Sequence, residues 1–355
     1  MGKSIESMQN DLNILYPTEG FVFDTHTDMQ NEFIEKIRNH GIDDALNWLE
    51  RVKNNKECSY PSELTFKWEG SSECGYTFEI SKNPDFSDSY NMVCEVPSCT
   101  LYNFEVGERY YWRVNGGRKN SFYTKNNSVR FIKIDGALNV RDVGGNKIKQ
   151  GLIFRGSDLS TNYKITETGK KVFLNILKIK TEIELRKEMG DETVSAVGDM
   201  VRYKYLPYRP YKEIFEEEHR TGIKNIMEFL SNEDNYPVYI HCLGGADRTG
   251  MVALFLRALV GESDEMIHTD YELTSLSSYA GDITEGADKN GFRRRNSDYY
   301  TEFLDMLDVY APSEPLSKKI RNFLFDCGVT NECIEKIIKI IKDDTESEKK
   351  MVPLS

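Results

Sequence analysis

Residues 237–250 read Pro-Val-Tyr-Ile-His-Cys-Leu-Gly-Gly-Ala-Asp-Arg-Thr-Gly, and this stretch decides the fold of the second half of the chain. Its first four residues predict a short buried strand, and the apolar run from Met251 to Val260 predicts a buried helix. A strand, a glycine-bearing turn and a helix in this order direct successive backbone N–H groups toward one point. Such a point at a helix N-terminus binds a phosphate dianion.

The side chains of this turn add chemistry to the predicted phosphate site. Cys242 stands at its mouth, where the field of the helix favours the nucleophilic thiolate over the thiol. Arg248, six positions on, carries a planar guanidinium that can bind two phosphate oxygens. Gly244 and Gly245 let the backbone approach a ligand closely. The Thr249 hydroxyl is expected to donate a hydrogen bond to the Cys242 sulfur.

Together these residues form a Cys-x5-Arg pattern that resembles the signature of the protein tyrosine phosphatase superfamily. A second segment, Asn139-Val140-Arg141-Asp142-Val143-Gly144-Gly145 followed by Leu152 to Ser157, resembles the amino-terminal signature of a bacterial subfamily. Glu184-Leu185-Arg186 stands where that subfamily has Asp-Leu-Arg. The resemblance spans about residues 130–340. It implies an α/β phosphatase domain with a mostly parallel sheet flanked by helices, which agrees with the alternation of strand and helix patterns over this region.

The resemblance also implies a mechanism without a cofactor, in which Cys242 attacks phosphorus and Asp247 protonates the leaving group. Asp142 and Asp282 are alternatives for the acid, and a turn or helix cap is the structural alternative for Asp142. His241 is expected to support the loop and the thiolate, with a plain core histidine as the alternative. The expected catalytic residues are Cys242, Arg248, Asp247, Thr249 and His241, and the expected substrate-binding residues are Leu243, Gly244, Gly245, Ala246, Asp142 and Arg141.

Two features bear on the substrate. Members of the subfamily that also hydrolyse phosphoinositides have Lys where this chain has Ala246, which favours phosphotyrosine. Arg293-Arg294-Arg295 could recognise an acidic phosphopeptide or a lipid headgroup, although a solvated charge cluster is the simpler interpretation. The expected function is therefore hydrolysis of phosphotyrosine through a cysteinyl phosphate. A phosphoinositide or dual-specificity phosphatase and a non-catalytic phosphate-binding adaptor remain alternatives.

The region from Leu64 to Thr124 has a different sequence pattern. Short runs of alternating apolar and polar residues are separated by turn signals such as Asn83-Pro84-Asp85. These runs predict a small antiparallel β-sandwich and resemble fibronectin type III-like modules of bacterial proteins. The resemblance implies a spacer, a scaffold or a binding module. The aromatic residues of these runs are expected to pack in the core and at the edges, with an exposed binding platform as the alternative: Trp68, Trp112, Tyr110 and Tyr111.

Four segments are expected along the chain: a helical segment at 1–55, the fibronectin-like sandwich at 56–127, the phosphatase domain at 128–345 and a flexible tail at 346–355. In the first segment, Asp28 is expected to cap a helix that begins near Met29, and Gly41 to divide it into two.

Composition limits the partners and the compartment. The 355 residues carry 46 Lys and Arg against 58 Asp and Glu, a net charge of −12. Such a chain repels nucleic acid and anionic lipid in general, so a bound anion needs a local pocket. No apolar run approaches the roughly 20 residues that cross a bilayer.

The seven cysteines show no zinc-site spacing. They are expected to be free thiols, although a Cys94–Cys99 bridge is conceivable. The start has no apolar signal core, so the chain as written is expected to be cytoplasmic, or secreted or at the cell surface if a leader was removed.

Overall fold

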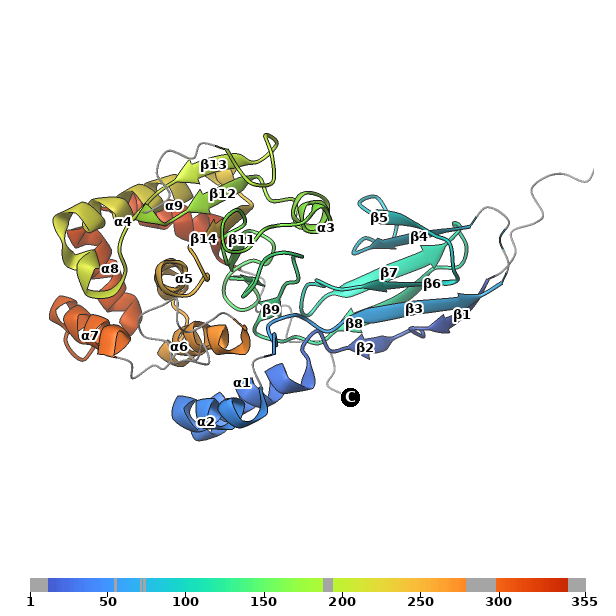
Figure 1. The fold of residues 1–355 in the computed structure, drawn as a ribbon, viewed down its shortest axis with the longest axis horizontal. Coiled ribbons are helices and arrows are strands. Elements are labelled where there is room, and N and C mark those ends of the chain that lie inside the picture. The colour runs from blue at the N-terminus through green and yellow to red at the C-terminus, as the bar shows by residue number, and fades with distance from the viewer. Residues whose placement is uncertain are drawn as a thin grey trace, which may run out of the picture. The chain divides into compact units, whose positions relative to one another are not determined.

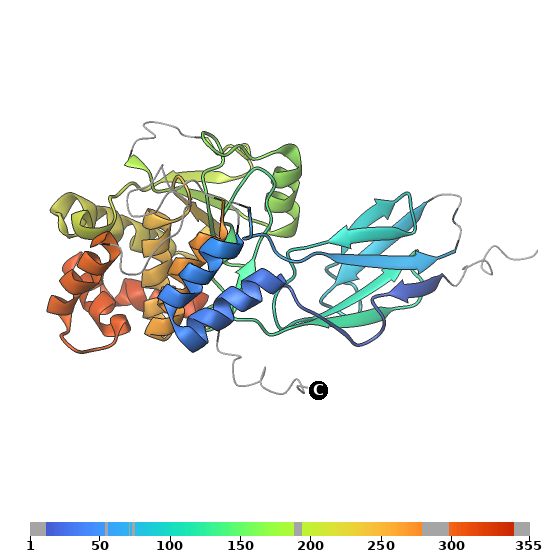
Figure 2. The same cartoon turned by 60° about the horizontal axis from the view of Figure 1, so that its bottom comes forward.

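The computed structural model describes residues 12–53, 56–70, 72, 75–187, 194–278 and 298–343. The chain divides into two compact units, and each unit takes two separate stretches of sequence. One combines Met1–His26 with Pro61–Ser128 and is called the β unit. The other combines Thr27–Tyr60 with Val129–Ser355 and is called the α/β unit. The ribbon of each unit is drawn in Figures 1 and 2.

The β unit consists of two sheets. The first has the strand order β1 (Asn13–Tyr16), β3 (Leu64–Glu69) and β6 (Ser98–Leu101). The second has the order β2 (Phe21–Phe23), β8 (Asn120–Thr124), β7 (Arg109–Val114), β4 (Tyr76–Ser81) and β5 (Tyr90–Cys94). All pairs are antiparallel except β2 with β8. The predicted antiparallel strands are therefore present, and residues 13–23 add two more that the sequence analysis did not assign to this unit.

Alternation along these strands builds the core of the β unit. In β3, Leu64, Phe66 and Trp68 are buried, while the residues between them are more exposed. Trp112 of β7 is also buried and contacts the Phe66 ring edge-on. Both tryptophans thus lie in the core, as the alternation predicts. Tyr111 is half-buried beside the Arg109 guanidinium, 4.8 Å from its ring centre.

The α/β unit is built on a six-stranded sheet with the order β13 (Arg202–Tyr205), β12 (Thr181–Glu184), β14 (Val238–His241), β11 (Ile153–Gly156), β10 (Arg141–Asp142) and β9 (Arg130–Phe131). The first four strands are parallel, and β10 and β9 are antiparallel to their neighbours. This mixed, mostly parallel sheet agrees with the expected class. Both neighbours of β14 are parallel to it, so Cys242 follows the carboxyl end of a central strand.

Helices cover both faces of this sheet. Val238 and Ile240 pack into one core with α4 (Glu217–Leu230), α5 (Asp247–Leu259), α8 (Leu316–Asp326) and α9 (Asn331–Ile341). Tyr239 points the opposite way and contacts Phe173, which lies in the π-helical segment η2 (Val172–Ile176) that continues α3 (Glu167–Lys171). Helices α6 (Asp264–Glu272) and α7 (Asp298–Leu307) also belong to this unit. None of the described helices is both long and apolar enough to span a membrane.

The helices α1 (Asp28–His40) and α2 (Ile42–Val52) also belong to the α/β unit, which corrects the expected helical segment at 1–55. Their apolar faces, with Phe33 and Leu46, pack on Val129, Phe131 and Leu273, and Figure 1 draws them beside α6. An amphipathic pattern does not name its partner, so the sequence could not assign these helices to a unit.

The ends of the helix pair differ in detail from the expectation. Thr27, not Asp28, caps α1, and its side chain accepts from the N–H of Gln30 while the Gln30 side chain accepts from the N–H of Thr27, in a reciprocal capping box. Gly41 ends the helix at φ +88°, as the predicted break requires.

Each described cysteine is a free thiol, Cys94 and Cys99 included. The expected tail at 346–355 lies outside the described residues.

Candidate active site

The loop 242–246 joins β14 to α5 and presses on the end of the neighbouring strand β11. Gly245 has φ +66°, and a Cβ atom built on it would lie 2.4 Å from the carbonyl carbon and oxygen of Gly156. Glycine is therefore required here by both the backbone angle and the space. Leu243, Asp247 and Arg248 are partly exposed, and the other residues from Cys242 to Gly250 are buried.

Four consecutive carbonyl oxygens of the loop accept hydrogen bonds, three from neighbouring segments and the fourth from the first turn of α5. The pairs are Leu243 O with the Asp158 N–H at 3.0 Å, Gly244 O with Asn139 Nδ2 at 3.0 Å, Gly245 O with Arg155 Nη2 at 2.8 Å, and Ala246 O with the Gly250 N–H at 2.9 Å. The scaffold therefore fixes the orientation of each peptide plane.

The orientation of these planes determines where the loop amides point. The loop peptides are trans, so each N–H points away from the carbonyl of its own peptide unit. Because the carbonyls are bonded to the scaffold, the following N–H groups point to the opposite side. Within the described part of the chain, the amides of Gly244, Gly245 and Ala246 donate to no protein acceptor. This set of unbonded amides is called the amide cradle, and consecutive amides of this kind suit an anion.

A buried charge network, here called the base network, supports the loop from behind. Asp270 lies 3.0 Å from Arg141 Nε, 2.5 Å from Arg155 Nη1 and 3.5 Å from Arg257 Nη2. Burial opposes ionisation, but these guanidinium groups hold the pKa of Asp270 well below its usual range. Arg141 also donates to Asn139 Oδ1 at 2.6 Å, which turns the Asn139 amide nitrogen toward the loop.

Asp142 has a structural position that corrects its place among the substrate-binding residues. Its carboxylate lies 3.0 Å from Arg130 Nη1 and accepts from the N–H groups of Gly144 and Gly151 at 2.8 and 2.6 Å. The side chain is fully buried, so these contacts stabilise the turn after β10. Arg141 is likewise buried in the base network, and burial together with Arg155 lowers its pKa to about 10. Asp142 therefore stabilises the turn after β10, and Arg141 supports the loop through Asn139 and Asp270.

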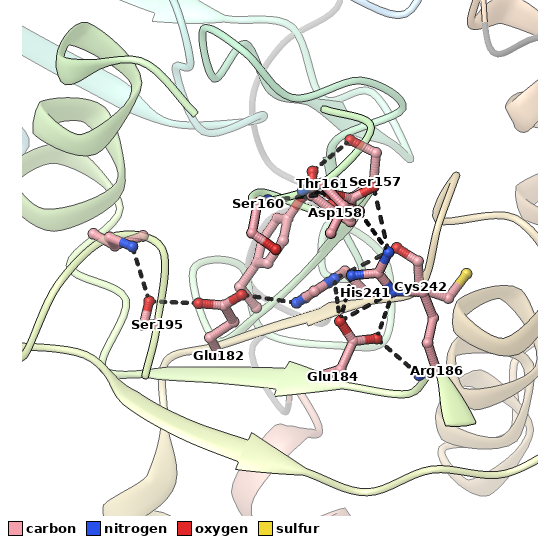
Figure 3. Close-up of polar contacts among 12 residues, drawn as sticks. Ser157, Asp158, Ser160, Thr161, Glu182, Glu184, Arg186, Ser195, His241 and Cys242 are labelled. Atoms are coloured by element: carbon pink, nitrogen blue, oxygen red, sulfur yellow. Dashed lines mark hydrogen bonds and ion pairs between the residues drawn. The ribbon is translucent and has the colours of Figure 1, made fainter. Parts of the chain in front are cut away.

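His241 lies beneath the cysteine, between two buried carboxylates (Figure 3). Its Nε2 is 2.9 Å from Glu182 Oε1, and its Nδ1 is 3.7 Å from Glu184 Oε2 and 3.4 Å from the carbonyl oxygen of Cys242. Burial alone would lower the pKa of His241, but the two carboxylates outweigh it and raise that pKa. The paired carboxylates thus favour the protonated form of this imidazole.

The two carboxylates are themselves fixed by neighbours that the sequence did not suggest as site residues (Figure 3). Ser195 Oγ donates to Glu182. Arg186 binds Glu184 with Nη2 at 2.7 Å and reaches Thr161 Oγ1 with Nη1 at 2.9 Å. Burial opposes the charge on Arg186, but Glu184, Asp158 and the nearby Cys242 raise its pKa. Only the Glu-Leu-Arg segment, noted for its resemblance, pointed toward part of this cluster.

The rim of the loop is held by tyrosine hydroxyls, to which the sequence analysis assigned no role. Tyr208 donates to the carbonyl oxygen of Arg248 at 2.5 Å. Tyr211, in the 3₁₀ turn η4 (Tyr211–Phe215), donates to Asp247 Oδ1, and its hydroxyl lies 2.8 Å from that of Tyr271 in α6.

Thr249 differs from its expectation. Its buried hydroxyl has no hydrogen-bond partner in the described residues, so the expected bond to the Cys242 sulfur is not present. Asp282 and Arg293–Arg295 lie outside the described residues. No cluster of His, Cys, Asp or Glu suited to a metal ion occurs in the part of the chain that the structure describes.

A cysteine after a central parallel strand, an amide cradle and an arginine six residues on define the class of cysteine-dependent phosphatases. The chain belongs to the tyrosine phosphatase family, since the model of that family matches residues 132–347.

Individual relatives are more distant. A candidate tyrosine-protein phosphatase named OCA1, from Debaryomyces hansenii, is 31% identical over 110 residues, which are 28% of this chain. The match covers 54% of that protein, so the chain spans about half the length of its curated relative. A crystal structure of the core catalytic domain of the PP-IP phosphatase SIW14 from S. cerevisiae, in complex with citrate, is 19% identical and covers 36% of this chain and 74% of its own, with a TM-score of 0.27. A second Siw14 catalytic core is 16% identical and covers 54% of this chain and 90% of its own, with a TM-score of 0.29.

Proposed function

We propose that the chain hydrolyses phosphotyrosine and related aryl phosphate monoesters through a cysteinyl-phosphate intermediate. The observation that carries this proposal is the amide cradle: the loop carbonyls are bonded to the scaffold, and the amides of Gly244, Gly245 and Ala246 remain for an anion. The cradle lies directly after the Cys242 nucleophile.

In the first step, the Cys242 thiolate attacks phosphorus in line with the leaving oxygen. The S–P bond forms as the P–O bond to the aryl group breaks. The loop amides and Arg248 stabilise the charge on the equatorial oxygens. Asp247 gives its proton to the departing phenolate oxygen, which makes it the general acid.

In the second step, water attacks the cysteinyl phosphate and the S–P bond breaks. Asp247, now a carboxylate, accepts the proton of this water, and inorganic phosphate is released. The thiolate is the leaving group of this step, at the start of α5, where a helix N-terminus stabilises negative charge. No cofactor takes part in either step.

The substrate class rests on the charges around the loop. Ala246 brings no cation. The buried Arg141 and Arg155 pair with Asp270, and Arg257 pairs with Glu262 and Asp270. Within the described residues, Arg248 in the first turn of α5 is the cation that the Cys-x5-Arg motif supplies. A single phosphoryl group on a neutral aromatic ring suits this site better than a polyphosphorylated ligand, which needs several cations.

The test measures kcat/KM of the wild type and Cys242→Ser on a phosphotyrosine peptide, a phosphoinositide and p-nitrophenyl phosphate. We expect vanadate-sensitive turnover that EDTA leaves unchanged and that the Ser variant lacks, with the phosphopeptide preferred. A preference for the phosphoinositide would overturn the substrate class. Phosphopeptide binding without turnover would indicate an adaptor, and a requirement for added metal would exclude the cysteine mechanism.

For the β unit, we propose a fibronectin type III-like module that acts as a spacer or binding module. Its two sheets, antiparallel except for the pair of β2 and β8, and its tryptophan-containing core support this proposal. Trp112→Ala should destabilise this unit by about 3–5 kcal/mol. Below the melting temperature of the α/β unit, the variant should still hydrolyse p-nitrophenyl phosphate. If activity is lost at the same temperature as the structure of the β unit, a spacer role is wrong.

A further inference from the structure

We propose that Tyr211 and Tyr271 are positioning residues for the acid Asp247, and that they select which of its carboxyl oxygens carries the transferable proton. The proposal rests on the proposed function, in which Asp247 protonates the leaving group. Neither tyrosine belongs to the Cys-x5-Arg motif, and each comes from a different segment of the chain.

Tyr211 is built to hold a fixed position beside the loop. It is buried and lies at φ +60°, a backbone angle that is strained for a residue with a bulky side chain. Its ring stacks on Tyr299 with 6.0 Å between ring centres. The strained backbone aims the hydroxyl at Asp247 Oδ1, to which it donates a hydrogen bond. Strain that delivers one hydroxyl to one carboxyl oxygen points to a functional constraint.

Tyr271 gives this contact a direction. Its hydroxyl lies 2.8 Å from the Tyr211 hydroxyl, and its ring stacks on Tyr300 with only 4.0 Å between centres. A phenol has one proton to donate. Because the Tyr211 proton is directed to Asp247, Tyr271 must donate to Tyr211. Burial, together with Tyr211, raises the pKa of Tyr271 well above its usual value, so Tyr271 keeps the proton that this arrangement needs.

The donor chain therefore runs from Tyr271 to Tyr211 to Asp247 Oδ1. With Oδ1 acting as an acceptor, the proton of the carboxylic acid resides on Oδ2. Oδ2 gives that proton to the phenolate oxygen as the P–O bond breaks, and the same atom takes a proton from water in the second step. Holding the carboxyl group against rotation keeps the acid in the geometry for transfer.

The experiment compares Tyr211→Phe and Tyr271→Phe with the wild type on two substrates, phenyl phosphate and p-nitrophenyl phosphate. The value of kcat/KM reports the first step, and phenolate needs protonation far more than nitrophenolate does. A general acid contributes 10²–10⁴-fold, and we expect Tyr211→Phe to lose about tenfold on phenyl phosphate and under about threefold on p-nitrophenyl phosphate. Tyr271→Phe should show the same pattern with a smaller loss.

Two controls separate positioning from general damage. Tyr236→Phe removes a buried hydroxyl that donates to the Leu230 carbonyl at 2.7 Å, near the opposite end of β14 from Cys242, and should leave the ratio between the substrates unchanged. In an Asp247→Asn background, Tyr211→Phe should cause no further loss on phenyl phosphate.

The outcomes are distinct. Equal losses on both substrates for Tyr211→Phe and Tyr271→Phe, or additive losses in the Asp247→Asn background, would overturn the positioning role while leaving the proposed function intact. An Asp247→Asn variant with no added sensitivity to the leaving group would overturn the assignment of the acid, and the proposal with it. A wild type inert toward both substrates would overturn the proposed function itself.

Discussion

The loop is held from behind by ions and at its rim by neutral hydroxyls. Behind it, Arg155 binds a loop carbonyl while Arg141 and Arg257 join Arg155 on Asp270. At the rim, Tyr208 and Tyr211 contact the residues that follow the cradle. Ions hold a backbone firmly when every charge is matched, and hydroxyls orient an acid without adding charge beside a phosphate dianion. The difference suggests that the base network fixes shape and the rim directs a proton.

The base network should be the more costly side to break. Asp270→Asn removes the anion that three buried guanidinium groups share, and we expect a loss of about 3–5 kcal/mol in the free energy of unfolding. Urea denaturation measures it. The exposed pair Lys318–Glu314 offers a control, since Glu314→Gln should cost under about 1 kcal/mol. If the two variants lower the free energy of unfolding equally, the base network does not stabilise the fold more than an exposed ion pair does.

The shape of the cradle is tested at Gly245. A Cβ here would lie 2.4 Å from Gly156 backbone atoms, so Gly245→Ala must displace the loop. Losing aligned donors costs about 10²–10³-fold each, and we expect kcat to fall at least about 100-fold. Gly261→Ala is the matched control, because Gly261 also has positive φ (+74°) but nothing within 4 Å of its Cβ position. It should lose stability without losing turnover.

The charge on His241 gives a pH-dependent prediction. Its pKa is raised in the folded protein, so its pairing with Glu182 and Glu184 stabilises the fold fully below the unfolded value of about 6.5. That contribution is lost as the pH rises through the raised folded-state pKa. His241→Gln should therefore cost about 1–3 kcal/mol at pH 6 and less at pH 9. A difference that grows with pH would show that the imidazole is neutral in the folded state.

The smallest effect is expected at the rim. Tyr208→Phe removes one hydrogen bond to the Arg248 carbonyl, worth about 1 kcal/mol, and should lower kcat/KM by about threefold on both substrates. Because Tyr208 holds backbone and not the acid, its loss should not depend on the leaving group. A larger loss on phenyl phosphate than on p-nitrophenyl phosphate would contradict this role and would show that Tyr208 also acts on the acid.

Local patterns predicted the parts of the site that are contiguous in sequence. The strand, the turn with Cys242 and the helix with Arg248 follow from residue types and spacing within fourteen residues. Asp142 stayed ambiguous because a carboxylate near a glycine turn suits both an acid and a cap, and only its contact with Arg130 decides. Tyr211 and Tyr271 were missed because tyrosine is common and their meeting depends on how η4 and α6 pack.

The interleaving of the two units along the chain has a consequence for cleavage by proteases. The chain passes from one unit to the other three times, between residues 26 and 27, 60 and 61, and 128 and 129. A protease that cuts at one of these crossings leaves the β unit and the α/β unit covalently joined through the other two crossings. Nor does a single cut yield an intact unit, since removing residues before 129 strips the helices that cover Val129 and Phe131. Gene fragments that isolate the phosphatase must therefore retain 27–60, rejoined to 129 by a linker.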